Sequence, residues 1–354
     1  MHLLFHFPHA SNVTGVYQTY SSNNHSSFEP AVHRSCENSI LFHMKKLIIT
    51  IGVLCMVGVL YALPVAFSEK QVKESAKKSE DKVCEIYIEI EGQSEKIPLE
   101  SYITGVVAAE MPVTFHKEAL KAQAIAARTY ALKTTNFGEK PIAPTVARQV
   151  YYDETKRKSN WKADFLGNEK KIVEAVEETK GQVLLYNNEL ITAMFHSTSN
   201  GKTESAYGYS GNELAYLQSV ASMSDQSSPK FATMREWSLD EWNAIWGIKW
   251  QSSDFKSVQL TLNASGRVEK LQLGKNSWTG REVRTLLQLP SNDFKISYDE
   301  SAQKVQVTTK GYGHGVGMSQ YGADAMASEG KSASEILHYY YQQIEIKKID
   351  ACLK

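Results

Sequence analysis

The chain has 354 residues, of which 42% are hydrophobic and 22% charged, as in an ordinary globular protein. That length allows two domains or one large one. Basic and acidic residues number 39 each, so net charge gives no argument for a nucleic-acid partner and is compatible with a neutral sugar polymer.

The segment before Met44 differs from the rest of the chain. It holds six of the ten histidines and shows neither a helical nor a strand period. We interpret residues 1–43 as a disordered, upstream translation artefact, with Met44 as the true start. The alternative is a metal-binding tail, which the irregular spacing of the histidines disfavours.

An apolar stretch, residues 47–67, follows Met44 and two lysines. It is long enough to span a bilayer core of roughly 30 Å, and the lysines favour a cytoplasmic N-terminus. We therefore predict a transmembrane signal-anchor over residues 44–67, which would place the body of a single-pass membrane protein outside the cytoplasm. The alternative is a signal peptide cleaved among the small residues 62–66.

Residues 68–82 are charged, lack an apolar period and predict a solvated linker. The body beyond them contains Cys84 and Cys352 and no CxxC motif. These two cysteines could pair, but we expect them to stay unpaired.

The body predicts an α+β fold with a mixed core of strands and helices. Residues 83–90 alternate as a strand does, and a helix is expected from about Ser101 to Pro112. An alanine-rich helix follows over 115–135. Further strands are expected at 147–152, 182–186 and 189–196.

The character of the sequence shifts over residues 213–300. A short tryptophan-rich helix and a hairpin turned at Ser265 and Gly266 predict a smaller inserted α+β subdomain. A strand, a glycine-rich turn and a helix follow. The catalytic core is therefore expected to comprise residues 83–212 and 301–349.

Glu110 ends an otherwise apolar or small run, directly before Met111 and Pro112. On a helix it lies on one face with Ile103, Val106 and Val107, and that face should be buried. Burial and the C-terminal end of the helix dipole would both raise the pKa of the carboxyl group, as a general acid needs. A partly exposed or arginine-neutralised glutamate is the alternative.

Arg128 is surrounded by apolar residues on its helix. A buried guanidinium needs an acid or other oxygens, because an unpaired buried charge is costly. Glu110, a carbonyl group and a substrate are all possible partners, and the sequence alone does not choose among them.

Two further segments could bind a ligand. The turn FHSTSNGKT, residues 195–203, could hydrogen-bond sugar hydroxyls through its own hydroxyls, or be an ordinary polar turn. GYGHGVGMSQYGA has glycine at alternate positions, which leaves backbone bare for close approach by another backbone or a ligand. Ser319 could cap the following helix, and His314 could orient a substrate, pair with Glu110 or be structural.

Metal ligands are not clustered in the sequence beyond Met44. No HExxH spacing and no cysteine pair occurs there, so we expect neither a catalytic metal nor another cofactor.

Five segments match, in order, the motifs of a known family. They read LESYITGVVAAEMP, EALKAQAIAARTYAL, QVYYDE, FHSTSNGKT and GYGHGVGMSQYGADAMA, and they cover most of residues 83–349. With these motifs and the anchor, the chain resembles the sporulation protein D family (stage II), which has broader relatives that enhance cell-wall amidases.

The resemblance implies a lytic transglycosylase that cleaves peptidoglycan between N-acetylmuramic acid and N-acetylglucosamine, leaving a 1,6-anhydro end. It places the family's catalytic glutamate at Glu110 and its arginine at Arg128. Glu110 would protonate the glycosidic oxygen and then take the proton of the sugar's own C6 hydroxyl, so one carboxylate suffices. Some relatives carry a zinc-binding cysteine pair before the QVY segment, which this chain lacks.

The resemblance also implies partners and a preferred substrate. The partners would be an anchored amidase and a membrane scaffold protein, acting together in engulfment of the forespore. The substrate would be glycan strands whose stem peptides an amidase has removed. Side chains that could contact such a strand through a hydroxyl or an amide are those of Tyr151, Ser197, Ser199, Gln320 and Tyr321.

Two other functions stay open at this point. The chain could be a non-catalytic partner that binds the wall or an amidase without cutting, as in the amidase-enhancer branch. It could also be a hydrolase that uses Ser197 or Ser199 with His314, although no acid partner stands at a recognisable spacing and no G-x-S-x-G motif occurs.

Overall fold

The computed structural model describes residues 51–52 and 85–349. The chain divides into two units, Met1–Asp81 and Lys82–Lys354, and residues 85–349 belong to the second. The segment 1–43, most of the anchor, the linker and both body cysteines lie outside the described residues. Among the residues that are described, no helix combines the length and the apolar character needed to cross a bilayer.

The second unit is a mixed α+β fold, as predicted. Its described α-helices are α2 (Leu99–Glu110), α3 (Lys117–Thr135), α4 (Glu154–Trp161), α5 (Phe165–Glu177), α6 (Ala206–Ser210), α7 (Leu239–Trp246), α8 (Gly280–Leu286), α9 (Gln320–Ser328) and α10 (Ala333–Tyr340). Short 3-10 helices are η1 (Lys162–Asp164), η2 (Met223–Ser227) and η3 (Ser252–Lys256). The strands are β1 (Tyr87–Glu89), β2 (Lys96–Pro98), β3 (Gln182–Tyr186), β4 (Glu189–Leu190), β5 (Phe195–His196), β6 (Ala232–Ser238), β7 (Gln259–Leu262), β8 (Val268–Leu273), β9 (Asn276–Thr279), β10 (Asp293–Asp299), β11 (Lys304–Lys310), β12 (Met318–Ser319) and β13 (Glu345–Lys348).

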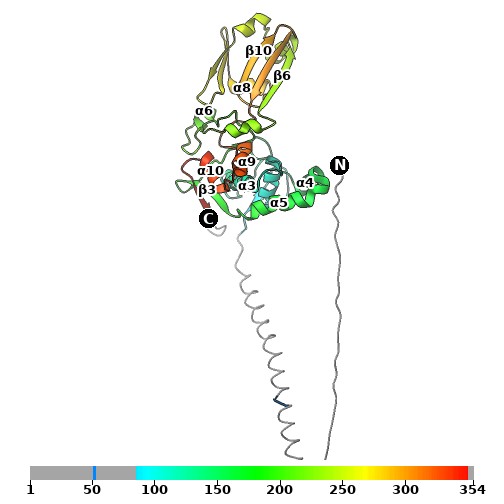
Figure 1. The fold of residues 1–354 in the computed structure, drawn as a ribbon, viewed down its shortest axis with the longest axis vertical. Helices are drawn as coiled ribbons and strands as arrows, with labels where there is room; N and C mark the ends of the chain where they lie inside the picture. Colours follow the sequence, from blue (N-terminus) through cyan, green and yellow to red (C-terminus); the bar gives the residue numbers. More distant parts are fainter. Residues whose placement is uncertain (1–50, 53–84, 350–354) are drawn as a thin grey trace, which may run out of the picture. The chain divides into compact units, whose positions relative to one another are not determined.

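Residues 85–231 and 311–349 form what we call the helical lobe, which is built around α3. This helix packs against α2, α5, α9, α10 and strand β3, and Figure 1 shows these elements gathered together. Its many alanines are fully buried, and such small side chains allow neighbouring helices to approach closely. The antiparallel sheet β13–β3–β4 completes this lobe, and β5 and β12 pair in parallel beside it.

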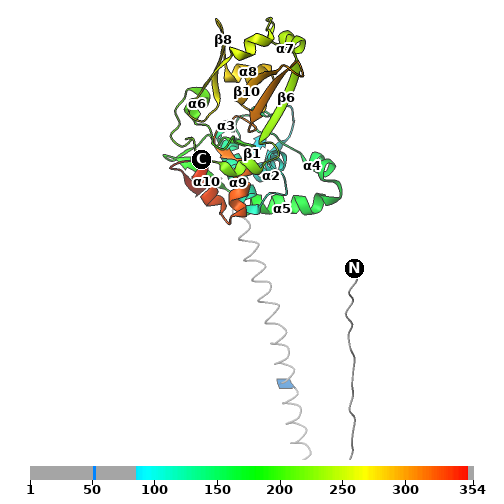
Figure 2. The same cartoon turned by 45° about the horizontal axis from the view of Figure 1, so that its top comes forward.

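Residues 232–310 form what we call the tryptophan lobe. It contains two antiparallel sheets, β10–β11–β6 and β7–β8–β9, with α7 and α8 (Figure 2). Trp242, Trp246 and Trp250 lie at the centre of its hydrophobic core, with Val305 and Val307 of β11 in the same core. Strand β11 was predicted to belong to the catalytic core. We therefore propose that the inserted subdomain ends near residue 310 rather than at residue 300.

Several predicted elements are confirmed. The two helices on either side of Pro112 form as α2 and α3. The predicted hairpin forms as β7 and β8, and the strand 182–186 forms as β3. The predicted strand 189–196 is interrupted, since β4 and β5 are separated by residues without strand structure.

The predicted strand 147–152 is wrong. Residues 145–148 form a turn, in which the N–H of Arg148 donates to the Thr145 carbonyl at 2.9 Å, and the N–H groups that follow bond to helix α2 instead of a neighbouring strand. The N–H of Val150 donates to the Glu110 carboxylate at 3.0 Å, and the N–H of Tyr152 donates to the Gly105 carbonyl at 3.2 Å. Residues 149–152 therefore run past α2 without pairing with a strand.

Candidate active site

Glu110 occupies the last position of α2, at the end of the buried stripe that the sequence predicts. Ile103, Val106 and Val107 have no exposed surface, whereas Glu110 is half-buried. Met111 follows in an extended conformation, which ends the helix. The carboxyl group thus projects where the apolar face of α2 reaches the edge of the core.

The surroundings of Glu110 hold its carboxyl group in one place. Oε1 accepts the N–H of Val150 at 3.0 Å, and the side chain of Gln320 also hydrogen-bonds the carboxyl group. Burial raises the pKa of Glu110, and the two hydrogen bonds oppose this increase without cancelling it. The predicted direction of the pKa shift is therefore confirmed, and Glu110 keeps its proton to a higher pH than an exposed glutamate.

Gln320 reaches Glu110 because the start of α9 is tied to the turn after β5. Ser319 caps α9 by accepting the N–H of Gly322 at 3.3 Å, as predicted. The N–H of Tyr321 donates to the carbonyl of Ser197 at 3.1 Å. Three predicted contact residues (Ser197, Gln320 and Tyr321) are thereby brought together, with Gln320 against Glu110.

Tyr151 lies on the other side of Glu110, directly after Val150. Its ring stacks on that of Tyr102, with centroids 5.4 Å apart and planes 9° from parallel. Tyr102 lies close enough to Glu110 for the carboxylate charge to raise the pKa of its hydroxyl group, after the larger effect of burial. Tyr151 is partly exposed, so its side chain can be reached from solvent.

Arg128 is not part of this site. Its side chain has no exposed surface, and its guanidinium pairs with Glu100, Nε lying 3.0 Å from Oε1. The remaining N–H groups donate to backbone carbonyls, including that of Gln182 at 3.2 Å. The partner of Arg128 is therefore Glu100 rather than Glu110, and the prediction that Arg128 binds substrate is wrong in this arrangement.

Ser199 also lies away from the candidate groove. It is fully buried, and its hydroxyl group donates to Asp225, which in turn accepts the hydroxyl of Ser319. Asp225 thus joins the turn 195–203 to the start of α9. The prediction that Ser199 contacts a sugar is wrong, because its hydroxyl group is already used inside the protein.

His314 does not pair with Glu110. Its Nδ1 accepts the N–H of Val316 at 3.0 Å, and its ring lies 5.6 Å from the ring of Tyr209 and 5.8 Å from that of His196. No histidine–serine pair with an acid is present among the described residues at this turn, since Ser199 bonds to Asp225. The serine hydrolase alternative therefore gains no support.

The glycine-rich turn is covered by the protein's own backbone. A Cβ at Gly317 would lie 2.0 Å from the carbonyl oxygen of Met194, and Gly317 also has a φ of +70°. Tyr312 exchanges hydrogen bonds with Thr198 in the same region. The sequence left two possibilities for this bare backbone, close approach by another backbone segment or by a ligand. The structure shows the first, so a sugar chain cannot occupy that face.

Sequence reasoning missed Val150, Gln123 and Asp225. The side chain of Gln320 donates to Oε1 of Gln123 at 3.5 Å, and Nε2 of Gln123 is buried without a partner. Gln123 stands among buried alanines on α3, a signal that could have drawn attention to it. Val150 acts through its backbone and Asp225 through distant serines, and neither has a local sequence signal.

The assembled groups can perform proton transfer. A half-buried carboxyl group with a raised pKa is held by two hydrogen-bond donors, as general acid–base catalysis requires. Across the described ranges, no cluster of histidine, cysteine, aspartate or glutamate is placed to hold a metal ion.

Comparisons with known proteins bear on the same residues. The family model described as Stage II sporulation protein matches residues 87–186, a range that includes Glu110, Arg128 and Val150. A stage II sporulation protein D of Bacillus amyloliquefaciens is 42% identical over 267 residues, which cover 73% of this chain and 77% of that protein. A stage II sporulation protein D of Bacillus subtilis (strain 168) is 37% identical over 338 residues, which cover 88% of this chain and 98% of that protein. An amidase enhancer of the same strain is 31% identical over 291 residues, which cover 68% of this chain and 39% of the enhancer.

Proposed function

Since the chain belongs to the stage II sporulation protein D family, we propose that it is a lytic transglycosylase of peptidoglycan that acts in sporulation. It cleaves the bond between N-acetylmuramic acid and N-acetylglucosamine and leaves a 1,6-anhydro end. One observation carries the proposal, namely that Glu110 is half-buried, has a raised pKa and is held by hydrogen bonds at the edge of the core.

Glu110 acts first as an acid and then as a base. Its carboxyl proton passes to the glycosidic oxygen while the bond from the anomeric carbon to that oxygen breaks. The sugar's C6 hydroxyl oxygen then bonds to the anomeric carbon, and its proton passes to the Glu110 carboxylate. The proton is returned, no water is consumed, and a second protein carboxylate is not required.

The hydrogen bonds to Glu110 suit both steps. Burial favours the protonated form, which must exist before the first step. The N–H of Val150 and the side chain of Gln320 stabilise the carboxylate, which exists after the first step. Each state of the carboxyl group is thus favoured by one feature of the site, as a group that alternates between the two requires.

We place the protein at the cell membrane through the anchor 44–67, with its body facing the cell wall. Its partners in this proposal are a membrane-anchored amidase and a membrane scaffold protein of the engulfment machinery. The amidase supplies strands without stem peptides. Tyr151, Ser197 and Tyr321, which are partly exposed, are the proposed polar contacts to such a strand. Gln320 is buried and bonds Glu110 instead, so we no longer assign it a contact with the sugar.

A second candidate is a non-catalytic enhancer of a wall amidase. The similarity to an amidase enhancer over 68% of this chain favours it. The two candidates differ in product, because an enhancer alone releases no anhydro sugar. We would incubate purified amidase-stripped strands with the full-length protein and no amidase, then analyse the sugars by mass spectrometry. Anhydro ends support the transglycosylase, and intact strands support the enhancer.

A further inference from the structure

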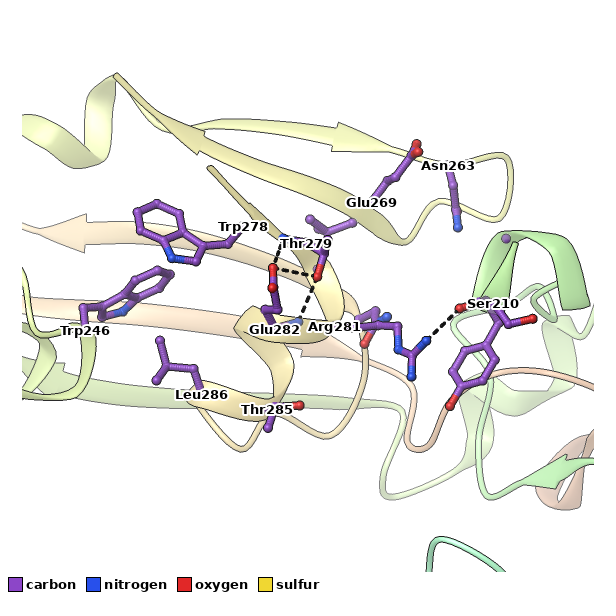
Figure 3. Close-up of a pocket in the computed structure, with 15 residues that line it drawn as sticks. Ser210, Trp246, Asn263, Glu269, Trp278, Thr279, Arg281, Glu282, Thr285 and Leu286 are labelled. Carbon is purple, nitrogen blue, oxygen red and sulfur yellow. Dashed lines mark hydrogen bonds between the residues drawn. The ribbon is translucent and has the colours of Figure 1, made fainter. Parts of the chain in front are cut away.

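A pocket of about 910 Å³ lies where the tryptophan lobe faces α6. Its volume suits a ligand the size of one or two sugars. Figure 3 shows Trp246 and Trp278 at one end and Arg281 toward the other. The pocket thus combines aromatic rings with one cation, and nothing in the proposed mechanism uses it.

Arg281 is fixed in this pocket by groups that leave its charge without a counter-ion. Its guanidinium carbon lies 4.5 Å from the centroid of the Tyr209 ring, and Nη1 donates to the Tyr209 carbonyl at 3.2 Å. Among the residues that the structure describes, Arg281 forms no ion pair with a carboxylate. A pre-positioned guanidinium of this kind is well suited to a carboxylate ligand.

The acids that line the pocket do not neutralise Arg281. Glu282 is held in the cap of α8, where it accepts the N–H of Thr279 at 2.7 Å. Glu269 points away from the Arg281 guanidinium in Figure 3. The acidic lining residues therefore leave the cation free for a ligand.

Further positive charge lies beside the pocket. Arg284 donates to the carbonyls of Leu289 and Pro290 and, within the described part of the chain, forms no ion pair. Burial and then the charges of Arg284 and Arg267 lower the pKa of His314 to about 4. His314 contacts Tyr209, so Arg284 and Arg267 add positive charge near that ring, and the carboxylates of Glu204 and Asp293 offset part of the Arg267 charge.

We propose that this pocket binds a carboxylate-bearing sugar of the glycan strand, with Arg281 pairing the carboxylate and Tyr209 and Trp278 packing against the sugar. The proposal rests on the proposed substrate, peptidoglycan. When an amidase hydrolyses the bond between muramic acid and the stem peptide, each lactyl group is left with a free carboxylate. Stem peptides also carry carboxylates, so the test must separate the two sources.

The pocket is connected to Glu110 through residues in contact. Tyr209 meets His314, and His314 meets His196, the neighbour of Ser197. The carbonyl of Ser197 accepts the N–H of Tyr321, next to Gln320 at the carboxyl group. These contacts lie inside the protein, since His196 is buried, so they set the position of the pocket relative to Glu110 and do not mark the path of a strand. A pocket that pairs a free lactyl carboxylate would select stripped strands.

The test measures binding rather than cleavage. The full-length protein with Glu110→Gln is titrated with three sets of strand fragments: amidase-stripped, stripped with every carboxylate converted to its methylamide, and peptide-bearing. Arg281→Gln is added in this background, with Lys295→Gln as the matched control, because Lys295 is exposed in the same lobe outside the pocket. Thermal unfolding shows whether each variant is folded.

Arg281→Gln should weaken binding of stripped fragments by about tenfold or more, as expected for loss of a charged hydrogen bond. Binding of the methylamide fragments should not change, Lys295→Gln should have no effect, and Arg281→Lys should retain part of the affinity. An Arg281-dependent affinity for peptide-bearing fragments alone would support the pocket and assign the carboxylate to the peptide.

Equal binding of carboxylate and methylamide fragments by the protein with Glu110→Gln alone would overturn the inference. Equal affinities of Arg281→Gln and Lys295→Gln for stripped fragments would overturn it as well. Arg281-dependent binding without any anhydro product from the parent chain would instead overturn the proposed function and leave the pocket standing.

Discussion

At Glu110 two physical effects oppose each other, and burial is the stronger. The folded protein therefore holds this proton more tightly than the unfolded chain does. A raised carboxyl pKa means that the stabilising contribution of the neutral form is present at low pH. That contribution is lost as the pH rises from the unfolded pKa through the folded pKa.

Glu110→Gln should show this linkage directly. The amide keeps the shape of the side chain and cannot ionise. The free energy of unfolding of the variant should therefore equal that of the parent at about pH 4 and be higher than that of the parent at about pH 8. The gain should be about 1 kcal/mol or less, because water partly screens a half-buried group. Urea unfolding at both pH values measures it. A variant less stable than the parent at the higher pH would mean that ionised Glu110 stabilises the fold.

Arg128 and Glu100 form an ion pair that is largely buried, and we expect it to matter for stability rather than for binding. Arg128→Lys should lower the unfolding free energy by about 2–4 kcal/mol, because lysine cannot donate to both Glu100 and the surrounding carbonyls. A double-mutant cycle with Glu100→Gln should show strong coupling. If Arg128→Lys weakened glycan binding and left the unfolding free energy unchanged, Arg128 would have to be a substrate-binding residue.

At the scale of elements, the sequence predicted the helices and strands that can be identified from the spacing of their apolar and polar side chains alone. Helices α2 and α3 and the β7–β8 hairpin are of this kind. The segment 147–152 has no regular alternation, and its hydrogen-bond partners belong to α2, which the local sequence does not indicate. Ser199 failed for a related reason, since its hydroxyl group meets an aspartate from a distant part of the chain.

The segment that holds Glu110 depends on a small residue in α2. A Cβ at Gly105 would lie 2.3 Å from the Tyr151 ring and 2.7 Å from the Tyr152 carbonyl oxygen. Gly105→Ala should therefore displace the Val150 N–H and reduce cleavage by about a hundredfold, the cost of a misplacement of about 1 Å. We would measure the rate of anhydro product release together with thermal unfolding.

Gly167→Ala on helix α5 is the matched control, because a Cβ there meets nothing within 4 Å. It should leave activity unchanged and stabilise the helix by up to about 1 kcal/mol. If Gly105→Ala behaved in the same way, the segment 150–152 would not depend on close packing against α2.

At the scale of the whole second unit, the lobes are joined by buried polar contacts. Glu204 of the helical lobe accepts hydrogen bonds from Asn263 at 2.6 Å and from Ser265 at 2.7 Å. Arg267 reaches back to the carbonyl of Lys202 at 3.0 Å. Because Ser265 and Arg267 are buried, these contacts hold the Arg281 pocket in a fixed position relative to Glu110.

The activity should not require a metal ion. This chain lacks the cysteine pair of some relatives, and cleavage should proceed at an unchanged rate after treatment with EDTA. The measurement is anhydro product release before and after chelation, with zinc added back as the control. Loss of activity that zinc restores would reveal a metal site and contradict the mechanism.

The central claim is that Glu110 carries the proton in both steps. Its most direct test is the time course of 1,6-anhydro product release from amidase-stripped strands, by the parent and by Glu110→Gln, under conditions where both are shown to be folded. We expect anhydro ends from the parent and a rate at least about a thousandfold lower from the variant, within the range for loss of general acid–base catalysis. Comparable rates from the two proteins would remove Glu110 from the mechanism.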